Sequence, residues 1–313
     1  MFQNLLIAFE AVAPMFITLA VGYGIGKAKM LDEHCIRYIN RILFKMLFPL
    51  VVIQNLYGAS IKDAFDIKLI AYSVLMAAAL WILTSLVIIK IEKNNPTRGA
   101  MIQAINRSNF LVIGFPVVNS ICGGENIAAA AFTIVGMLLV NNIAAVVVLE
   151  VFRGSKPDIK KIAKEIMINP IIIATVIGVV LMVFEIRMPY VIEKTAGSLC
   201  GIATPLALIV MGVSLDLKNL GERRKKIAIC VLGKLVIVPG IVTSIGALLG
   251  FRGVPFVTLL AFFTASPTTT SYTMADQLDS DGDLARDSLV FSTLLVTFTM
   301  FCWIFIYKTL GLF

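Results

Sequence analysis

Ten apolar stretches divide the chain and predict ten membrane-spanning helices. Each has 18 residues or more, which is close to the length needed to cross the hydrocarbon core of a bilayer. Short polar links separate them, and none of these links is long enough to form a soluble domain. The predicted spans cover residues 5–26, 36–57, 67–91, 99–121, 126–152, 167–184, 195–214, 226–250, 254–276 and 286–310.

The fourth and ninth stretches contain residues that an unbroken helix does not favour. Gly114 and Pro116 lie in the middle of one, and Pro267 lies in a run of hydroxyl residues in the other. Proline removes a backbone donor and clashes with the carbonyl four residues earlier. In hydrocarbon an unpaired backbone group costs several kcal/mol, so a broken helix persists only against protein or a watery cavity. Two interrupted helices in corresponding halves indicate the binding site of a transporter.

The spacing of prolines predicts that the chain is an inverted repeat. A first half, 1–152, and a second half, 166–313, flank a basic linker at 153–165 that is expected in the cytoplasm. Five spans in each half is an odd number, so the second half enters the membrane from the opposite side. The alternative is a chance alignment, because membrane helices tolerate proline. The matched pairs are Pro14 with Pro170 and Pro49 with Pro205, both 156 residues apart, and Pro116 with Pro267, 151 apart.

Composition and charge agree with an all-α polytopic membrane protein. The 313 residues are 59% hydrophobic and 15% charged, with a mean hydropathy of +0.93, whereas soluble domains are about 25% charged. The net charge of +8 comes from basic links between spans, so nucleic acid is not an expected partner and the lipid bilayer is. The five cysteines are an odd number without metal-ligand spacing, so we expect no metal site.

The distribution of lysine and arginine predicts the orientation. With the N-terminus outside, 17 of the 27 basic residues lie in inner links and six lie in outer ones. Basic residues favour the cytoplasmic side. We therefore expect a multi-pass protein of the plasma membrane with both termini outside. The first span lacks a basic leader and a cleavage site, so it is read as a retained helix.

Several motifs along the chain resemble the auxin efflux carrier family in their order and spacing. The fourth span resembles the family pattern N-x-x-F-x-G-x-P, with one extra residue before the glycine. The resemblance covers nearly the whole chain. The motifs are Asn109-Phe110 with Gly114-Phe115-Pro116, Asn169-Pro170, Thr204-Pro205-Leu206-Ala207-Leu208 with Gly212, Lys234 with Pro239, and Ser266-Pro267-Thr268 with Tyr272-Thr273-Met274-Ala275.

The resemblance implies a compact bacterial member of the larger group of bile acid, auxin and arsenite transporters. Plant members export auxin, and bacterial members are mostly described as permeases for malate, malonate or similar acids. The implied fold is like that of sodium/proton antiporters. Spans 1, 2, 6 and 7 would form a scaffold through which a homodimer could assemble. Spans 3–5 and 8–10 would form a moving core in which spans 4 and 9 cross at their breaks.

Polar groups at the two breaks are the candidate substrate contacts. Half-helix N-termini carry partial positive charge and free N–H groups that suit a carboxylate. The amide of Asn109 can donate and accept hydrogen bonds. The alternative is that the hydroxyls only cap carbonyls freed by the break. The candidates are Asn109, Gly114, Pro116, Ser266, Pro267, Thr268, Thr269 and Thr270.

Three charged residues inside predicted spans are candidates for coupling or charge balance. An ionisable residue within a span is costly and is a functional candidate by default. Lys234 could balance helix ends, bind the substrate anion or titrate during transport, or it could only extend toward the inner surface. Glu10 could sense protons or extend to the outer surface, and Arg107 could attract anions or anchor to headgroups. The neighbouring polar pair Asn141 and Asn142 could line the core.

These features predict a secondary transporter of a small organic anion that works by an elevator-type movement. Coupling, where present, would be to protons or sodium, and no other cofactor is expected. Closely related alternatives are a cation/proton antiporter and a sodium-coupled bile-acid-like symporter on the same fold. A channel would need a polar stripe through several spans. An enzyme is not expected, because the spans hold neither paired aspartates nor a serine and histidine pair.

Overall fold

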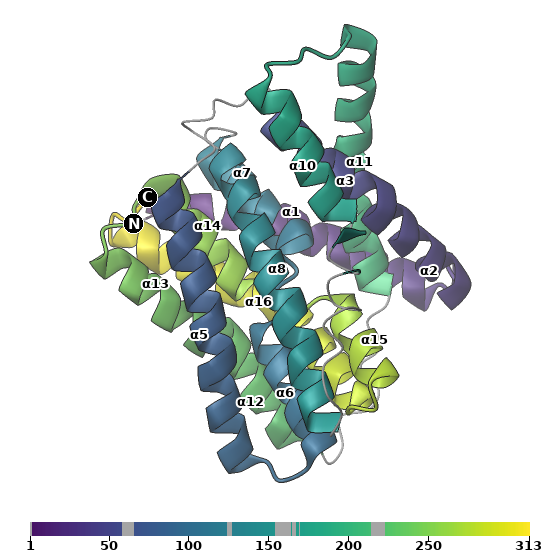
Figure 1. Ribbon diagram of the computed structural model, residues 1–313, viewed down its shortest axis with the longest axis vertical. Helices are drawn as coiled ribbons and strands as arrows, with labels where there is room; N and C mark the ends of the chain where they lie inside the picture. The colour runs from purple at the N-terminus through teal and green to yellow at the C-terminus, as the bar shows by residue number, and fades with distance from the viewer. Residues whose placement is uncertain are drawn as a thin grey trace.

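The part of the chain that the structure describes is mainly helical. The structure is a computed structural model, and it describes residues 2–57, 66–123, 127–153, 164, 167–168, 170–213 and 223–313. No strand occurs within these ranges. Figure 1 shows long helices crossing one another, with the two termini close together at one side.

The helices follow the apolar stretches of the sequence, and three of the paths contain a short π-helical segment. In the first half the helices are α1 (Phe2–Lys27), α2 (Glu33–Ile42), α3 (Phe48–Leu56), α5 (Ile67–Ile91), α6 (Asn95–Asn106), α7 (Phe115–Cys122) and α8 (Ile127–Arg153). In the second they are α10 (Pro170–Val183), α11 (Tyr190–Val213), α12 (Arg224–Leu232), α13 (Val238–Leu248), α14 (Gly253–Thr264), α15 (Thr269–Gln277) and α16 (Gly282–Thr309). The π-helical segments are η1 (Leu43–Leu47), η2 (Phe110–Gly114) and η3 (Gly233–Ile237).

Four helical paths among the described residues are long and apolar enough to cross a membrane. They are Ile67–Ile91, Tyr190–Val213, Arg224–Leu248 and Gly282–Thr309. Together with the all-helical fold they support a polytopic membrane protein. The full set of ten spans in two inverted repeats stays a prediction.

Each π-helical segment ends two residues before a proline that takes the second position of the next helix. The prolines are Pro49 in α3, Pro116 in α7 and Pro239 in α13. A proline ring would clash with the carbonyl four residues earlier, and that carbonyl belongs to the central residue of the π-helical segment each time. For Pro239 it is the carbonyl of Leu235, which accepts a hydrogen bond from the Trp303 indole at 2.9 Å instead. The wider turn therefore accommodates the ring without ending the helix.

The paired prolines do not produce the same local structure in the two halves. Pro14 lies inside α1, whereas Pro170 is the first residue of α10. Pro49 follows a π-helical segment, whereas Pro205 lies inside the continuous helix α11. The equal spacing of these residues thus does not extend to their backbone geometry.

Helices α1 and α11 pack closely because two glycines face each other. A Cβ atom on Gly22 would lie 2.2 Å from the carbonyl oxygen of Ile209, and one on Gly212 would lie 2.2 Å from that of Leu19. Small residues allow such close approach between membrane helices. Helix α3 packs against α10 and α11 in the same region.

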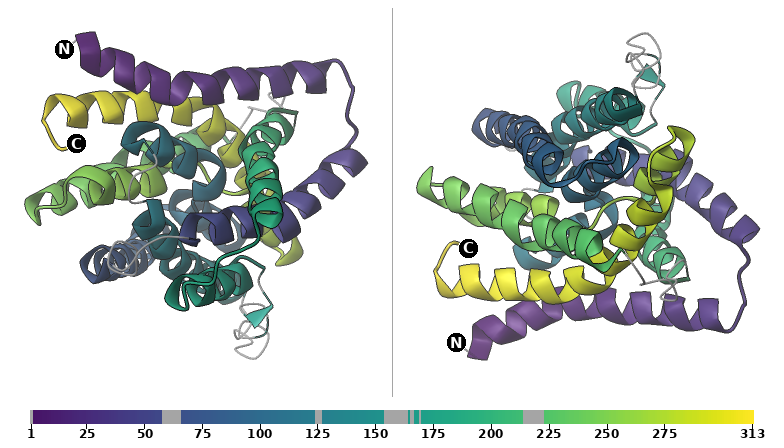
Figure 2. Two further views of the ribbon diagram at one scale, coloured as in Figure 1. Left: turned by 90° about the horizontal axis from the view of Figure 1, so that it is seen from above. Right: turned by 90° about the horizontal axis from the view of Figure 1, so that it is seen from below.

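The remaining helices form a second group of mutual contacts. Helices α5, α6 and α8 pack together, α12 and α16 pack against α6, and α14 packs against α7 and α13. The hydroxyl of Tyr72 in α5 donates to the carbonyl of Val242 in α13 at 2.6 Å. Helices α1 and α16 join the two groups and run side by side in opposite directions in both views of Figure 2.

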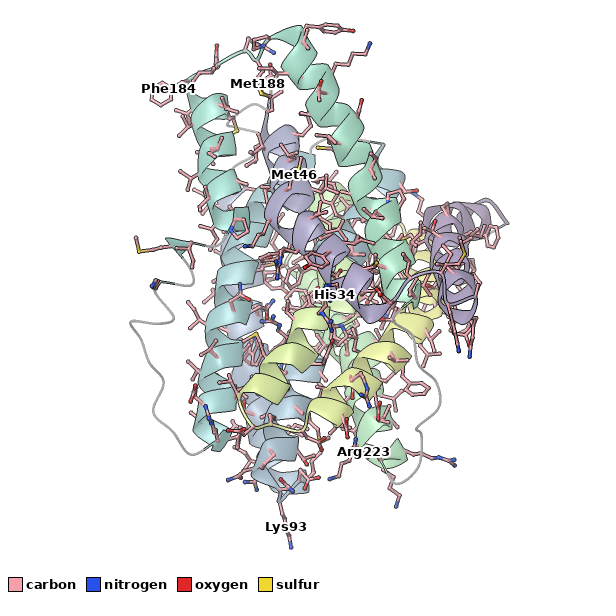
Figure 3. The ribbon with its side chains drawn as sticks, turned by 90° about the vertical axis from the view of Figure 1, so that its right-hand side faces the viewer. His34, Met46, Lys93, Phe184, Met188 and Arg223 are labelled. Carbon is pink, nitrogen blue, oxygen red and sulfur yellow. The ribbon has the colours of Figure 1, made fainter. Side chains whose placement is uncertain are left out.

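Links that the sequence predicts on opposite sides of the membrane lie far apart. Figure 3 shows Lys93 and Arg223 at one end of the molecule and Phe184 and Met188 at the other. The first pair belongs to predicted inner links and the second to a predicted outer link. His34, in another predicted inner link, lies between these two ends in Figure 3, and the orientation stays a prediction.

Replacing Gly22 with Ala should destabilise the folded protein. The added methyl group would collide with the backbone of α11, and overpacking of this kind costs about 1–3 kcal/mol. Gly24→Ala is the matched control, because a Cβ atom there meets nothing within 4 Å. Thermal unfolding of the purified protein in detergent should show a lower melting temperature for Gly22→Ala only. Equal melting temperatures would contradict the proposed contact.

Candidate functional site

The first break in a helix lies at residues 107–109. Helix α6 ends at Asn106, and the chain becomes helical again in η2 and then α7. The sequence predicts the interruption at Gly114 and Pro116, and this is wrong by several residues. Pro116 takes the second position of α7, where the preceding π-helical segment keeps the carbonyl of Val112 clear of the ring.

The second break lies at residues 265–268, between α14 and α15. It contains Pro267, as the sequence predicts. Ala265, Ser266 and Pro267 are buried, and Thr268 is half-buried. Because this break is largely buried, backbone atoms freed here need partners within the protein.

The two breaks provide partners for each other where they cross. The backbone N–H of Asn109 donates to the carbonyl of Ser266 at 2.7 Å. The hydroxyl of Ser108 donates to the carbonyl of Phe262 at 2.5 Å, and the rings of Phe110 and Phe262 lie 5.6 Å apart. The segments around residues 109 and 266 are therefore in direct contact.

Gly114 allows the crossing segments to approach closely. A Cβ atom on Gly114 would lie 2.5 Å from the ring of Phe110 and 2.9 Å from the carbonyl oxygen of Ala261. Its backbone angles are helical, with φ −73° and ψ −43°, so glycine is needed here for space and not for conformation.

Hydroxyl groups form a network along the second break. The Thr268 hydroxyl lies 2.8 Å from that of Thr270 and 3.1 Å from that of Ser271. Ser266 accepts a hydrogen bond from Thr293 of α16 at 3.2 Å. The side chain of Thr269 lies outside the described part of the chain. The hydroxyls thus bond to one another and to α16.

Arg107 joins the first break to α8 and to the start of α15. Its side chain is only 4% exposed. One Nη atom donates to Asn142 at 3.1 Å and the other donates to Thr270 at 2.8 Å. The adjacent Asn141 accepts from the indole of Trp81 at 2.8 Å. A buried position among polar groups excludes an anchor to lipid headgroups.

Lys234 is wholly buried, so the interpretation that it extends to the inner surface is wrong. It lies in η3, which contacts α14 and α16. Its Nζ atom has no hydrogen-bond partner among the described residues, and the same holds for the hydroxyls of Thr264 and Ser292 and for Nε of Arg107. Glu10 falls in α1, and its side chain lies outside the described part.

Sequence reasoning identified the two breaks but missed several residues that complete their surroundings. Asn142 appeared only as a polar residue at mid-membrane, and its polarity in an apolar span was the available signal. Thr293 and Trp81 have no local signal, because their partners are distant in the sequence.

Comparison with known proteins decides the family. The pattern of the family described as "Membrane transport protein" matches residues 7–304. The chain belongs to this family, the auxin efflux carrier family. An uncharacterized transporter of Methanothermobacter thermautotrophicus is 23% identical over 302 residues, which cover 94% of this chain and 96% of that protein. The family implies a small-molecule substrate and a membrane setting.

In this member of the auxin efflux carrier family, the crossing offers chiefly hydrogen-bond donors and positive charge. Helix α15 begins at the second break, so its free N–H groups lie beside the hydroxyl network. Arg107 lies against the same helix start. Within the described ranges, no group of three histidine, cysteine or acidic side chains is placed to hold a metal ion. The arrangement can bind an anion.

Replacing Gly114 with Ala should disturb the crossing. The methyl group has no room between Phe110 and the backbone of Ala261, so we expect a loss of about 1–3 kcal/mol in stability. Gly201→Ala is the control, because its Cβ atom would meet nothing within 4 Å. The melting temperature of the protein should fall for Gly114→Ala, and so should the rate at which liposomes that contain the protein take up its substrate. Both values should stay normal for the control. Normal values for both variants would show that the segments are not in close contact.

Proposed function

We propose that the protein is a secondary transporter of a small organic anion, auxin-like or malate- or malonate-like. The substrate binds where spans 4 and 9 cross. The observation that carries this proposal is the hydrogen bond from the backbone of Asn109 to the carbonyl of Ser266. This hydrogen bond joins the two broken helices of the protein, which belongs to a family of membrane transporters. Broken helices are where transporters hold their substrates.

The charges around the crossing favour an anionic substrate. Arg107 and Lys234 are both buried. No carboxylate among the described residues lies within 4.0 Å of either side chain. A buried charge is unfavourable unless it is paired. A bound carboxylate would supply the missing negative charge.

Asn109 is the first-choice substrate contact. Its backbone is held by Ser266, its side chain is half-buried, and its amide can donate as well as accept. Thr268 and Thr270 are accessible enough to contact the same ligand. The other candidate residues shape the crossing and carry no charge. They are Gly114, Pro116, Ser266 and Pro267.

Alternating access would come from an elevator-type movement of a core against a scaffold. The proposed core holds α5–α8 and α12–α16, and ion pairs join its members at one end. Lys226 lies 2.8 Å from Glu92, and Arg153 lies 2.8 Å from Asp279. The N–H of Asn94 and then the Lys226 ammonium lower the pKa of Glu92. These contacts favour a core that moves as one body.

The proposed scaffold consists of α1, α2–α3, α10 and α11. The glycine contact between α1 and α11 supports a rigid unit, and a homodimer would assemble through its outer surface. The protein would lie in the plasma membrane with both termini outside. Both views of Figure 2 show the two termini at the same side of the molecule, which supports a shared side.

Coupling would be to protons or sodium, with Lys234 as the residue that balances charge or exchanges a proton. The alternative is a cation/proton antiporter or a sodium-coupled bile-acid-like symporter on the same fold. Uptake of the organic anion with a sodium gradient alone or a proton gradient alone identifies the coupling ion, and a cation/proton antiporter would move cations without the organic anion.

Replacing Asn109 with Ala should lower the initial rate of organic anion uptake into liposomes at least tenfold, because the amide that contacts the substrate is lost. Asn119→Ala is the control, since Asn119 lies on α7 and is exposed. Size-exclusion chromatography would verify that both variants are folded. Unchanged uptake by folded Asn109→Ala protein would refute a substrate site at the crossing.

Replacing Lys234 with Gln should weaken anion transport severalfold or abolish its pH dependence, because a buried positive charge disappears. Lys45→Gln is the matched control, because Lys45 also lies in a π-helical segment but is exposed. Uptake would be measured across a range of pH for the wild type and both variants. If Lys234→Gln keeps both the normal rate and the normal pH profile, the lysine has no role in charge balance.

A further inference from the structure

Arg107 is a nearly buried cation, and its partners among the described residues are neutral groups. Its two Nη atoms donate to the Asn142 carbonyl oxygen and the Thr270 hydroxyl. Its Nε atom is buried and has no hydrogen-bond partner in the part of the chain that the structure describes. A buried arginine with a purely structural role is expected to pair with a carboxylate, because burial of an unpaired charge is costly.

The neutral partners fix the plane of the guanidinium group. Asn142 lies on α8 and Thr270 lies in the first turn of α15, so the group is held from two sides. The next residue on α8, Asn141, is itself held by Trp81. The Nε atom has no partner among the described residues, and Nε together with the adjacent Nη forms an edge that matches the two oxygens of a carboxylate.

The start of α15 adds to the attraction for an anion. The free N–H groups of a helix start carry partial positive charge, and the hydroxyls of Thr268 and Thr270 lie at this start. Thr270 is exposed although Arg107 is not. A ligand could therefore approach from the side of Thr270 and reach the guanidinium.

We propose that Arg107 binds a carboxylate group of the substrate directly, with Asn142 and Thr270 as positioning residues. The inference rests on the proposed function and adds a specific anion contact to it. Asn109 would then recognise another polar group of the same ligand. The positive charge of Arg107 makes the site selective for a carboxylate over its uncharged amide, since only the carboxylate neutralises the buried cation.

Calorimetric titration of the purified protein tests this selectivity with two pairs of probes. The pairs are malonate with malonamide and indole-3-acetate with indole-3-acetamide. We expect the wild type to bind at least one acid and to bind its amide at least tenfold more weakly. Arg107→Gln should lose at least tenfold in affinity for the acid and no longer prefer it over the amide. Arg107→Lys should also bind weakly, because an ammonium cannot offer the planar pair of donors.

Arg41→Gln is the charge-matched control. It removes one positive charge from an exposed position in α2, and its binding should equal that of the wild type. A general electrostatic effect would weaken this control as much as Arg107→Gln, and that result would overturn the proposal.

Asn142→Asp provides a second test that does not remove the arginine. The new carboxylate would lie beside Nη1 of Arg107 and neutralise it, so affinity for the acid should fall at least tenfold while the melting temperature is maintained or raised. A merely structural arginine would gain stability without any loss of binding. If Arg107→Gln fails to fold, Asn142→Asp still tests whether Arg107 binds the carboxylate.

The outcomes separate this inference from the proposed function. Wild-type affinity in folded Arg107→Gln or Asn142→Asp protein overturns the role of Arg107. If Asn109→Ala still abolishes binding in that case, the crossing site survives. If the wild type binds neither acid, both the carboxylate contact and the proposed class of substrate are wrong.

Discussion

The arrangement of the site depends on the hydrogen bond between the backbone N–H of Asn109 and the carbonyl of Ser266. Two helices stop within an apolar protein, and each break frees backbone groups that lipid cannot satisfy. The crossing satisfies one group of each break at the same contact. Gly114 permits the approach, and Ser108 pairs with a further carbonyl from α14. The polar residues at the two breaks therefore lie where they can satisfy the freed backbone groups.

Arg107 at the crossing and Lys234 in η3 carry positive charges that no described carboxylate within 4.0 Å balances. Both side chains are buried, and each has a nitrogen without a hydrogen-bond partner among the described residues. Such charges reduce stability, so their presence is better explained by binding than by folding. A transporter that exchanges one charged partner for another can use this imbalance. The charges therefore connect the geometry of the breaks to the proposed anionic substrate.

Much of the helical architecture could be predicted from the sequence, because long apolar stretches and prolines act locally. The interruption near Pro267 was predicted in this way, and the family was predicted from the order and spacing of several motifs. The break at residues 107–109 was misplaced, because a π-helical segment can accommodate Pro116 and sequence periodicity does not reveal that turn. The contacts of Arg107 with Asn142 and Thr270 could not be predicted, since they join residues 35 and 163 positions apart. The burial of Lys234 likewise depends on packing against distant helices.

A cryo-electron microscopy structure with a bound carboxylate tests the central claim most directly. The ligand would be the acid that raises the melting temperature of the protein most, added at saturation. The account predicts ligand density at the crossing, within hydrogen-bond distance of the Asn109 side chain and the start of α15. Ligand density elsewhere in the protein, with the crossing unchanged, would contradict it.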